Sequence, residues 1–148
     1  MYKYCPNLYK YERYQSRTVS IGDTPLGSKH PIRVQSMTTT NTLDIDATVE
    51  QSIKIIEAGS DYVRITAPSI NEAKALNKIR KTLHKKGYKT PLIADIHFTP
   101  NAAIEAARIV EKVRINPGNY ADKKKFLSFE YTDEEYSAEL DRIHDRFS

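Results

Sequence analysis

An α/β fold built on a parallel sheet is predicted by two features of the sequence. Four short apolar segments alternate with segments whose apolar residues recur at the helical period. A β-α order repeated in this way calls for parallel strands covered by helices. Two architectures fit that order: a doubly wound sheet, or the first four βα units of a TIM-type (β/α)8 barrel that is truncated before a fifth strand.

The four predicted strands are IRVQSM at 32 to 37, DYVRIT at 61 to 66, PLIADI at 91 to 96 and KVRIN at 112 to 116. We expect the first of them to be short and buried, and it follows a turn-rich segment, GDTPLGSKHP.

Capping signals place the helices between these strands. The first predicted helix spans residues 47 to 58, and either Asp44 or Asp46 can cap its start. Ser69 and Glu72 have the spacing of a capping box, which predicts the start of the second helix.

The last two helices are predicted in the same way. Thr99 followed by Pro100 predicts a capped helix start with proline in the first turn. Thr132 and Glu135 form another capping box before a helix from about 133 to 147. The apolar face of that helix is predicted to pack against a neighbouring element. It is formed by Tyr136, Leu140, Ile143 and Phe147.

The composition limits the function classes. The 148 residues suffice for one domain with a real core, and the net charge of +4 is too small and dispersed for a nucleic-acid binder. The single cysteine, Cys5, excludes an intrachain disulfide and a cysteine cluster for a metal. No stretch is long enough to span a membrane, so we expect a cytoplasmic protein.

The chain is predicted to have two parts. Residues 1–16 form a tyrosine-rich N-terminal extension, with five of the ten tyrosines in the first fourteen residues. Residues 17–148 form the α/β part.

Unusual polar residues stand at the carboxyl end of every predicted strand. In a parallel α/β sheet these ends meet at one rim, where such proteins bind their ligands. The residues concerned are Gln35 and Ser36, Arg64 and Thr66, Asp95 and His97, and Arg114, Asn116 and Asn119.

Arg64 and Arg114 are the strongest candidates for ligand binding. Two guanidinium groups on one rim can grip phosphate oxygens bidentately, which lysine cannot do with the same geometry. The alternative is that each forms a salt bridge, to Asp95 or to another carboxylate. Both interpretations can hold together, because a carboxylate can orient an arginine that also binds a ligand.

The remaining candidates allow two interpretations each. Asp95 and His97 are two residues apart, so they project to the same face and can serve in acid/base chemistry or in orienting a ligand. A hydrogen-bonded structural histidine fits equally well. Asn116 and Asn119 flank a Pro-Gly pair and can hold a hydroxyl or phosphate, or serve only the turn.

Four of these segments together carry a resemblance to a known family. PIRVQSMTTTNTLD, AGSDYVRITAP, PLIADIHF and VRINPGN resemble, in this order and spacing, the N-terminal half of the 4-hydroxy-3-methylbut-2-enyl diphosphate synthase family. The match runs from about residue 17 to residue 120. The tyrosine-rich opening and the charged last helix resemble the longer form of the family, found in some bacteria and in plastids.

The resemblance implies a function that composition does not. The family reductively opens 2-C-methyl-D-erythritol 2,4-cyclodiphosphate to a linear diphosphate in the non-mevalonate isoprenoid pathway. Its TIM-type barrel holds the substrate, and a C-terminal domain carries a 4Fe-4S cluster, fed with electrons by flavodoxin or ferredoxin. The cluster is ligated by three cysteines and a glutamate. No position of this chain matches them, so we expect it to be a fragment that binds no cluster or metal and is inactive alone.

Site residues carry over from the family by position. Arg64 and Arg114 match the diphosphate-binding arginines, and Asn116 and Asn119 match the amides beside them. Gln35 and Ser36 match the rim of the first strand, and Asp95 and His97 match groups that line the same cavity and are the candidates for a catalytic role. The parent enzyme is expected in the bacterial cytoplasm, without a nucleic-acid or membrane partner, and the sequence leaves open whether it is a homodimer.

Two other functions fit the residues. Pterin-dependent synthases use similar barrels and also place Asp, Asn and Arg at strand ends to hold a ring and a diphosphate. A non-catalytic binding module, with its last helix docking a partner, is the other alternative.

Overall fold

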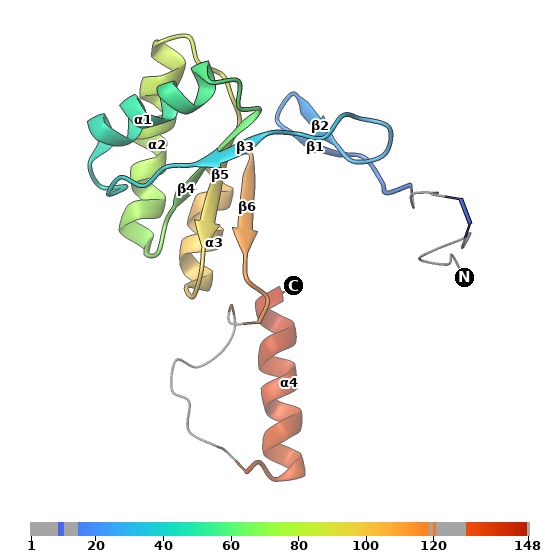
Figure 1. Cartoon of the computed structure of the whole chain (residues 1–148). Coiled ribbons are helices and arrows are strands. Elements are labelled where there is room, and N and C mark those ends of the chain that lie inside the picture. Colours follow the sequence, from blue (N-terminus) through green and yellow to red (C-terminus); the bar gives the residue numbers. More distant parts are fainter. Residues whose placement is uncertain (1–8, 11–14, 119, 121–129, 148) are drawn as a thin grey trace.

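The computed structural model describes residues 9–10, 15–118, 120 and 130–147 (Figure 1). Four strands form one parallel sheet: β3 (Gln35–Met37), β4 (Tyr62–Thr66), β5 (Leu92–Ile96) and β6 (Lys112–Ile115). The helices α1 (Ile45–Glu57), α2 (Ile70–Lys85) and α3 (Pro100–Ala107) connect them in turn. In the described part of the chain, no helix is long and apolar enough to cross a membrane.

The strand order distinguishes between the two predicted architectures. The strands are arranged β3-β4-β5-β6, which is their order in the sequence. Right-handed crossovers that always advance in one direction place every helix on the same side of the sheet, whereas a doubly wound sheet reverses its order and is covered on both sides. In Figure 1, α1, α2 and α3 lie together on one side. The arrangement is therefore that of a TIM-type barrel, present here as an open four-stranded sheet.

The hydrophobic core lies between this sheet and the three helices. Alternate residues of the central strands face the helices, because successive side chains of a strand point to opposite faces. On β4 and β5 these are Val63, Ile65, Leu92, Ala94 and Ile96, all at most 1% exposed. From the helices, Leu76, Ile79, Ala102 and Ala106 pack against them.

The opposite face of the sheet is polar toward its carboxyl ends. Arg64 stands beside Ile93, and Asp95 stands between Thr66 and Arg114. Side chains that are paired in register point to the same face. The sheet thus separates an apolar face, covered by helices, from an open face that carries the charged residues.

A β-hairpin precedes this sheet and was not predicted from the sequence. It consists of β1 (Val19–Ile21) and β2 (Thr24–Leu26), joined by the two-residue loop Gly22-Asp23, with Gly22 at a φ of 56°. Such loops favour glycine because they need a positive φ. The Gly-Asp pair between two short β-prone segments was the available signal, but Pro25 in the second segment argued against a strand.

The hairpin covers the amino ends of the central strands. Ile21 and Leu26 pack against Tyr62 and Ile93, the first open-face residues of β4 and β5. The Tyr62 hydroxyl donates a hydrogen bond of 3.0 Å to the Thr24 carbonyl. On the open face, the amino ends of β4 and β5 are therefore apolar and covered by the hairpin, whereas the carboxyl end is polar.

The prediction of a buried first strand is wrong. Only residues 35–37 form strand β3, and the preceding Ile32 and Val34 are 81% and 58% exposed. The reason is that β3 is an edge strand with a neighbour, β4, on one side only. An apolar sequence cannot by itself distinguish an edge strand from a central one.

The helix signals are largely confirmed. Asp44, and not Asp46, caps α1 by accepting a 3.0 Å hydrogen bond from the Ala47 amide. Ser69 caps α2, accepting from the Asn71 amide and hydrogen bonding to the Glu72 carboxylate. Thr99 is the N-cap of α3 and Pro100 lies in its first turn, as predicted, but the Thr99 hydroxyl donates to the Pro68 carbonyl and makes no side-chain capping bond.

The last helix, α4 (Asp133–Phe147), stands apart from the sheet in Figure 1. The Thr132–Glu135 capping box is confirmed, with the Thr132 amide 3.0 Å from Glu135 Oε2. On its predicted apolar face, Tyr136 and Leu140 are 57% and 48% exposed.

Candidate functional site

Three neighbouring strands bring Arg64, Asp95 and Arg114 into contact at the carboxyl end of the open face. Asp95 lies on the central strand β5, and one arginine comes from each strand beside it. Arg64 Nη2 is 2.5 Å from Asp95 Oδ2, and Arg114 Nη1 is 3.1 Å from Asp95 Oδ1. Each carboxylate oxygen therefore accepts from a different guanidinium group.

Asp95 is the most deeply buried charged group among the described residues. Its side chain is 1% exposed, whereas the side chains of Arg64 and Arg114 are 26% and 38% exposed. Burial pushes the pKa of Asp95 upward, but the hydrogen bond and charge of Arg64, with the charges of His97 and Arg114, outweigh it and lower the pKa below its usual 3.8. The carboxylate is therefore ionised at neutral pH, and two partly exposed arginines surround it.

His97 joins this group through the same carboxylate. Its Nε2 lies 3.1 Å from Asp95 Oδ2, and because the ionised carboxylate only accepts, Nε2 carries the proton. The ring also contacts Phe98 edge-on, with centroids 5.9 Å apart. The structure thus brings Asp95 and His97 together as predicted, with the aspartate holding the histidine in place.

Asn116 follows the last strand residue and helps to form the turn. Its side-chain Oδ1 accepts a 3.2 Å hydrogen bond from the Gly118 amide, as in an Asx turn. This hydrogen bond supports a role of Asn116 in the turn, and its ligand-binding role stays a prediction. Asn119 lies outside the described residues.

Gln35 and Ser36 lie on opposite faces of β3. Gln35 is in register with Tyr62 and shares the open face with Arg64, whereas Ser36 is in register with Val63, which faces the helices. Both side chains are exposed. Gln35 therefore lies on the same face of the sheet as the charged residues, and Ser36 lies on the opposite face.

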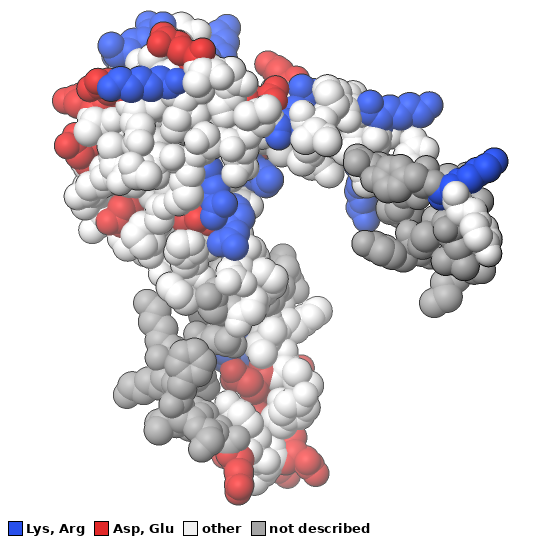
Figure 2. Space-filling view, in the orientation of Figure 1, with Lys and Arg blue, Asp and Glu red and all other residues white. Residues whose placement is uncertain are grey.

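A further basic residue on the open face was not singled out from the sequence. Lys112 precedes Arg114 by two positions on β6 and is in register with Ile93, so it points to the same face. Strand alternation would have identified it. Figure 2 shows a group of basic side chains in front of the strands near the carboxyl end of β6.

The two arginines have donors beyond those that Asp95 uses. A guanidinium has five N–H groups, and Asp95 is 2.5 Å from one nitrogen of Arg64 and 3.1 Å from one of Arg114. The Nε–H of Arg64 is buried and has no hydrogen-bond partner among the described residues. Unsatisfied buried donors are rare in proteins and call for an acceptor. The arrangement can therefore bind an anion whose oxygens complete these contacts.

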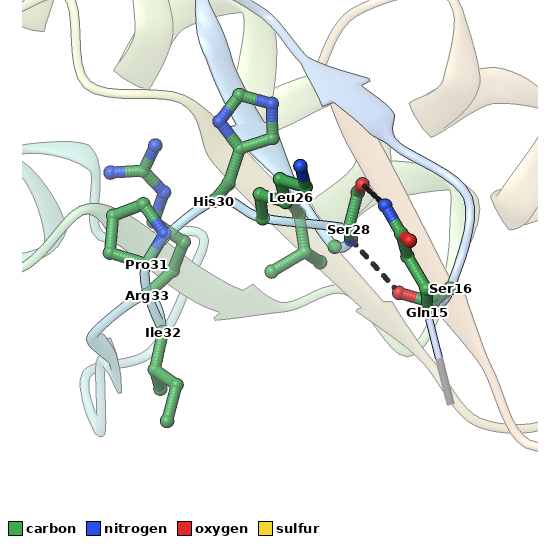
Figure 3. A pocket seen from close by; sticks show the side chains of 10 residues that line it. Gln15, Ser16, Leu26, Ser28, His30, Pro31, Ile32 and Arg33 are labelled. Carbon is green, nitrogen blue, oxygen red and sulfur yellow. Dashed lines mark hydrogen bonds between the residues drawn. The ribbon is translucent and has the colours of Figure 1, made fainter. Parts of the chain in front are cut away.

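A hollow of about 480 Å³ lies elsewhere, beside the hairpin (Figure 3). It is lined by residues 26 to 33 with Gln15 and Ser16. Its polar groups bond to one another: Gln15 donates to Ser28, and the Ser28 amide donates to Ser16. Of the Lys29 and Arg33 side chains that line it, that of Arg33 donates to the Pro25 carbonyl and to Asp61. The hollow therefore has less to offer a ligand than the strand ends.

The residues of this chain do not fit an iron–sulfur cluster. Such clusters are held by several thiolates, and the sequence has one cysteine, Cys5, which lies outside the described residues. Within the described ranges, no group of three His, Cys, Asp or Glu side chains is placed to hold a metal ion.

Comparison with known proteins gives a consistent set of relatives. A family model described as the GcpE TIM-barrel domain matches residues 16–138. The 4-hydroxy-3-methylbut-2-en-1-yl diphosphate synthase (flavodoxin) of Parabacteroides distasonis is 56% identical over 140 residues, which are 94% of this chain and 23% of that protein. The chloroplastic ferredoxin form of Oryza sativa subsp. japonica is 47% identical over 147 residues, 99% of this chain and 20% of that protein.

A third relative is the flavodoxin form of Protochlamydia amoebophila, 47% identical over 147 residues, which are 99% of this chain and 22% of that protein. The chain thus spans 20% to 23% of the length of these three relatives.

Proposed function

The chain belongs to the GcpE TIM-barrel domain family, and on that premise we propose that its strand ends bind the diphosphate of 2-C-methyl-D-erythritol 2,4-cyclodiphosphate. The observation that carries the proposal is the meeting of Arg64 and Arg114 on one buried carboxylate, with guanidinium donors left over. Asn116, which follows β6, Asn119, and Gln35 on β3 are the further residues that we assign to the substrate, whereas Ser36 faces the helices and is left out.

The electrostatics suit a diphosphate. Two arginines and one aspartate give the group a net charge of +1. A planar guanidinium bonds two phosphate oxygens at once, in a geometry that also suits its bond to a carboxylate. The hairpin covers the amino ends of β4 and β5 on the open face. The ligand therefore approaches at the carboxyl ends of the strands.

The whole reaction is assigned to a longer protein. The relatives carry the name of a diphosphate synthase that uses flavodoxin or ferredoxin. We infer that this chain is the substrate-holding part of such an enzyme, an iron–sulfur oxidoreductase of the non-mevalonate isoprenoid pathway in the bacterial cytoplasm. The 4Fe-4S cluster would supply the electrons for ring opening, and a homodimer is the assembly that we propose. The pterin-synthase alternative gains no support, because none of these relatives carries that name.

Arg114→Ala tests the assignment by calorimetric titration of this chain with the cyclic diphosphate. Losing one or two charge-assisted contacts should cost about 2 to 4 kcal/mol of binding free energy. That corresponds to an affinity loss of roughly 30-fold to 900-fold.

Arg108→Ala is the matched control, because it removes the same charge from an arginine whose side chain is 74% exposed, just after α3. Its affinity should stay at the wild-type value. Equal affinities of wild type and Arg114→Ala would refute the assignment, and equal losses in both variants would show that only net charge matters.

A further inference from the structure

Asp95 occupies the centre of the site and yet offers nothing to an incoming anion. Its side chain is 1% exposed, and its two oxygens are directed to Arg64 on one side and Arg114 on the other. His97 adds a third donor to Oδ2. An ionised carboxylate only accepts hydrogen bonds and repels phosphate, so its presence beside a phosphate site needs a separate explanation.

We propose that Asp95 is a positioning residue that holds Arg64 and Arg114 as one preformed anion-binding unit, without contacting the anion itself. The inference rests on the proposed function, because it concerns how the same site binds its ligand.

The strand register places both arginines within reach of Asp95. Arg114 stands directly beside Asp95, so its side chain crosses between neighbouring strands to reach Oδ1. Arg64 is in register with Ile93, two residues earlier on β5, so its side chain extends along the strand direction to reach Oδ2. Both guanidinium groups therefore meet at Asp95, near the carboxyl end of β5, where the sheet presents its ligand-binding rim.

Holding the arginines in advance favours binding. A free arginine side chain samples many rotamers, and ordering it when the ligand arrives lowers the affinity. Because Asp95 fixes the guanidinium planes, the arginine side chains are already ordered when the protein folds. Ligand binding then does not have to order them. The Nε–H of Arg64 and the other N–H groups that Asp95 does not engage are then directed by the same contact.

Charge and positioning predict opposite signs for one substitution. Asp95→Asn removes a negative charge and raises the net charge of the group by one. If Asp95 acts only through its charge, anions bind more tightly to the variant. If Asp95 holds the arginines, anions bind more weakly, because the amide can accept from one guanidinium and presents a repelling NH₂ group to the other.

The experiment is calorimetric titration of this chain with inorganic pyrophosphate at neutral pH. We expect Asp95→Asn to bind at least tenfold more weakly than wild type, despite its added positive charge. Asp95→Glu keeps the charge and displaces the carboxylate by one methylene, and it should also weaken binding. Asp61→Asn is the control, because that aspartate pairs with Arg33 beside the hairpin and its loss should leave pyrophosphate affinity unchanged.

The outcomes distinguish a failure of the proposed function from a failure of the positioning role of Asp95. If wild type does not bind pyrophosphate, the proposed function fails and this inference fails with it. If wild type binds and Asp95→Asn binds as tightly or more tightly, the inference alone is overturned. Unchanged affinity in Asp95→Glu overturns it as well.

A measurement on the wild-type protein covers the case in which the variants do not fold. In nitrogen-15 NMR spectra without ligand, held guanidinium groups should give separate Nη–H resonances for Arg64 and Arg114, assigned through single lysine substitutions. Resonances averaged by free rotation would contradict the proposal.

Discussion

The amino and carboxyl ends of the sheet use the same pair of residue types for different purposes. Beside the hairpin, Arg33 is 3.4 Å from Asp61, and each partner also bonds to the backbone: Arg33 to the Pro25 carbonyl and Asp61 to the Val34 amide. At the carboxyl end, two arginines share Asp95 and keep further donors. One group is balanced one to one within the fold, whereas the other has an excess of positive charge, and that excess is what identifies a ligand site.

The comparison also explains why arginine–aspartate contacts alone say little about function. Both ends satisfy the usual definition of a salt bridge, and both are partly buried. The difference lies in how many donors remain after the contacts within the protein are made. Substitutions that alter one end and spare the other can therefore test the distinction.

The largest effect is expected from removing the shared carboxylate. Asp95→Ala leaves two arginines without their buried partner, which should lower the free energy of unfolding by about 3 to 5 kcal/mol. Asp61→Ala removes charge-assisted hydrogen bonds from a side chain that is 29% exposed, and should cost about 1.5 to 3 kcal/mol. Urea denaturation measures both, and an Asp95 effect below that of Asp61 would contradict the comparison.

Protonating Asp95 at low pH should lower the free energy of unfolding by less than the Asp95→Ala substitution does. The pKa of Asp95 is lowered in the folded chain, so the stability it contributes is present above the usual carboxyl value of 3.8 and is lost as the pH falls through the folded value below it. Urea midpoints measured from pH 5 downward should fall more steeply for wild type than for Asp95→Asn. The lowered pKa of Glu72 acts in both proteins and cancels. Parallel curves would show that Asp95 does not contribute in this range.

The smallest effect is expected at the hairpin turn. At Gly22 (φ 56°), an added Cβ would lie 3.2 Å from Glu111 Cγ and 3.3 Å from Pro91 Cγ. Gly22→Ala should therefore cost at least about 1 kcal/mol of stability through backbone strain and crowding. Gly59→Ala is the control, because its φ of 93° is also positive but nothing lies within 4 Å. The Gly22 variant should lose more stability than the Gly59 variant, measured by thermal unfolding, and should retain wild-type pyrophosphate affinity.

The site was predictable from the sequence to the extent that strand ends were recognisable. Arg64, Asp95 and Arg114 each follow an apolar run, and parallel strands bring their carboxyl ends together, so their proximity followed from periodicity alone. Which face each residue occupies depended on register. Ser36 was grouped with Gln35 because both end the first strand, and only the pairing with β4 shows that they point to opposite faces.

The failures of prediction concern contacts between segments far apart in the chain. Thr99 is the N-cap of α3, as its sequence context indicates, but its hydroxyl bonds to the Pro68 carbonyl, in the loop after β4, and not to the helix. Ile32 and Val34 have the apolar character of a core strand, but an edge position leaves them exposed. The hairpin, with a proline in its second strand, is stabilised by Tyr62 and Ile93, which local sequence does not reveal.

The sequence by itself determined the alternation of strands and helices, the caps of α1, α2 and α4, and the presence of basic and acidic residues at the strand ends, because periodicity and capping act over a few neighbouring residues. The tertiary structure decided the rest: the sequential strand order, the single helix-covered face, and the sharing of Asp95 by Arg64 and Arg114. The physical reason is that burial and charge pairing depend on which strands become neighbours. Asp95 becomes a buried, ionised carboxylate only because β4 and β6 each place an arginine beside it.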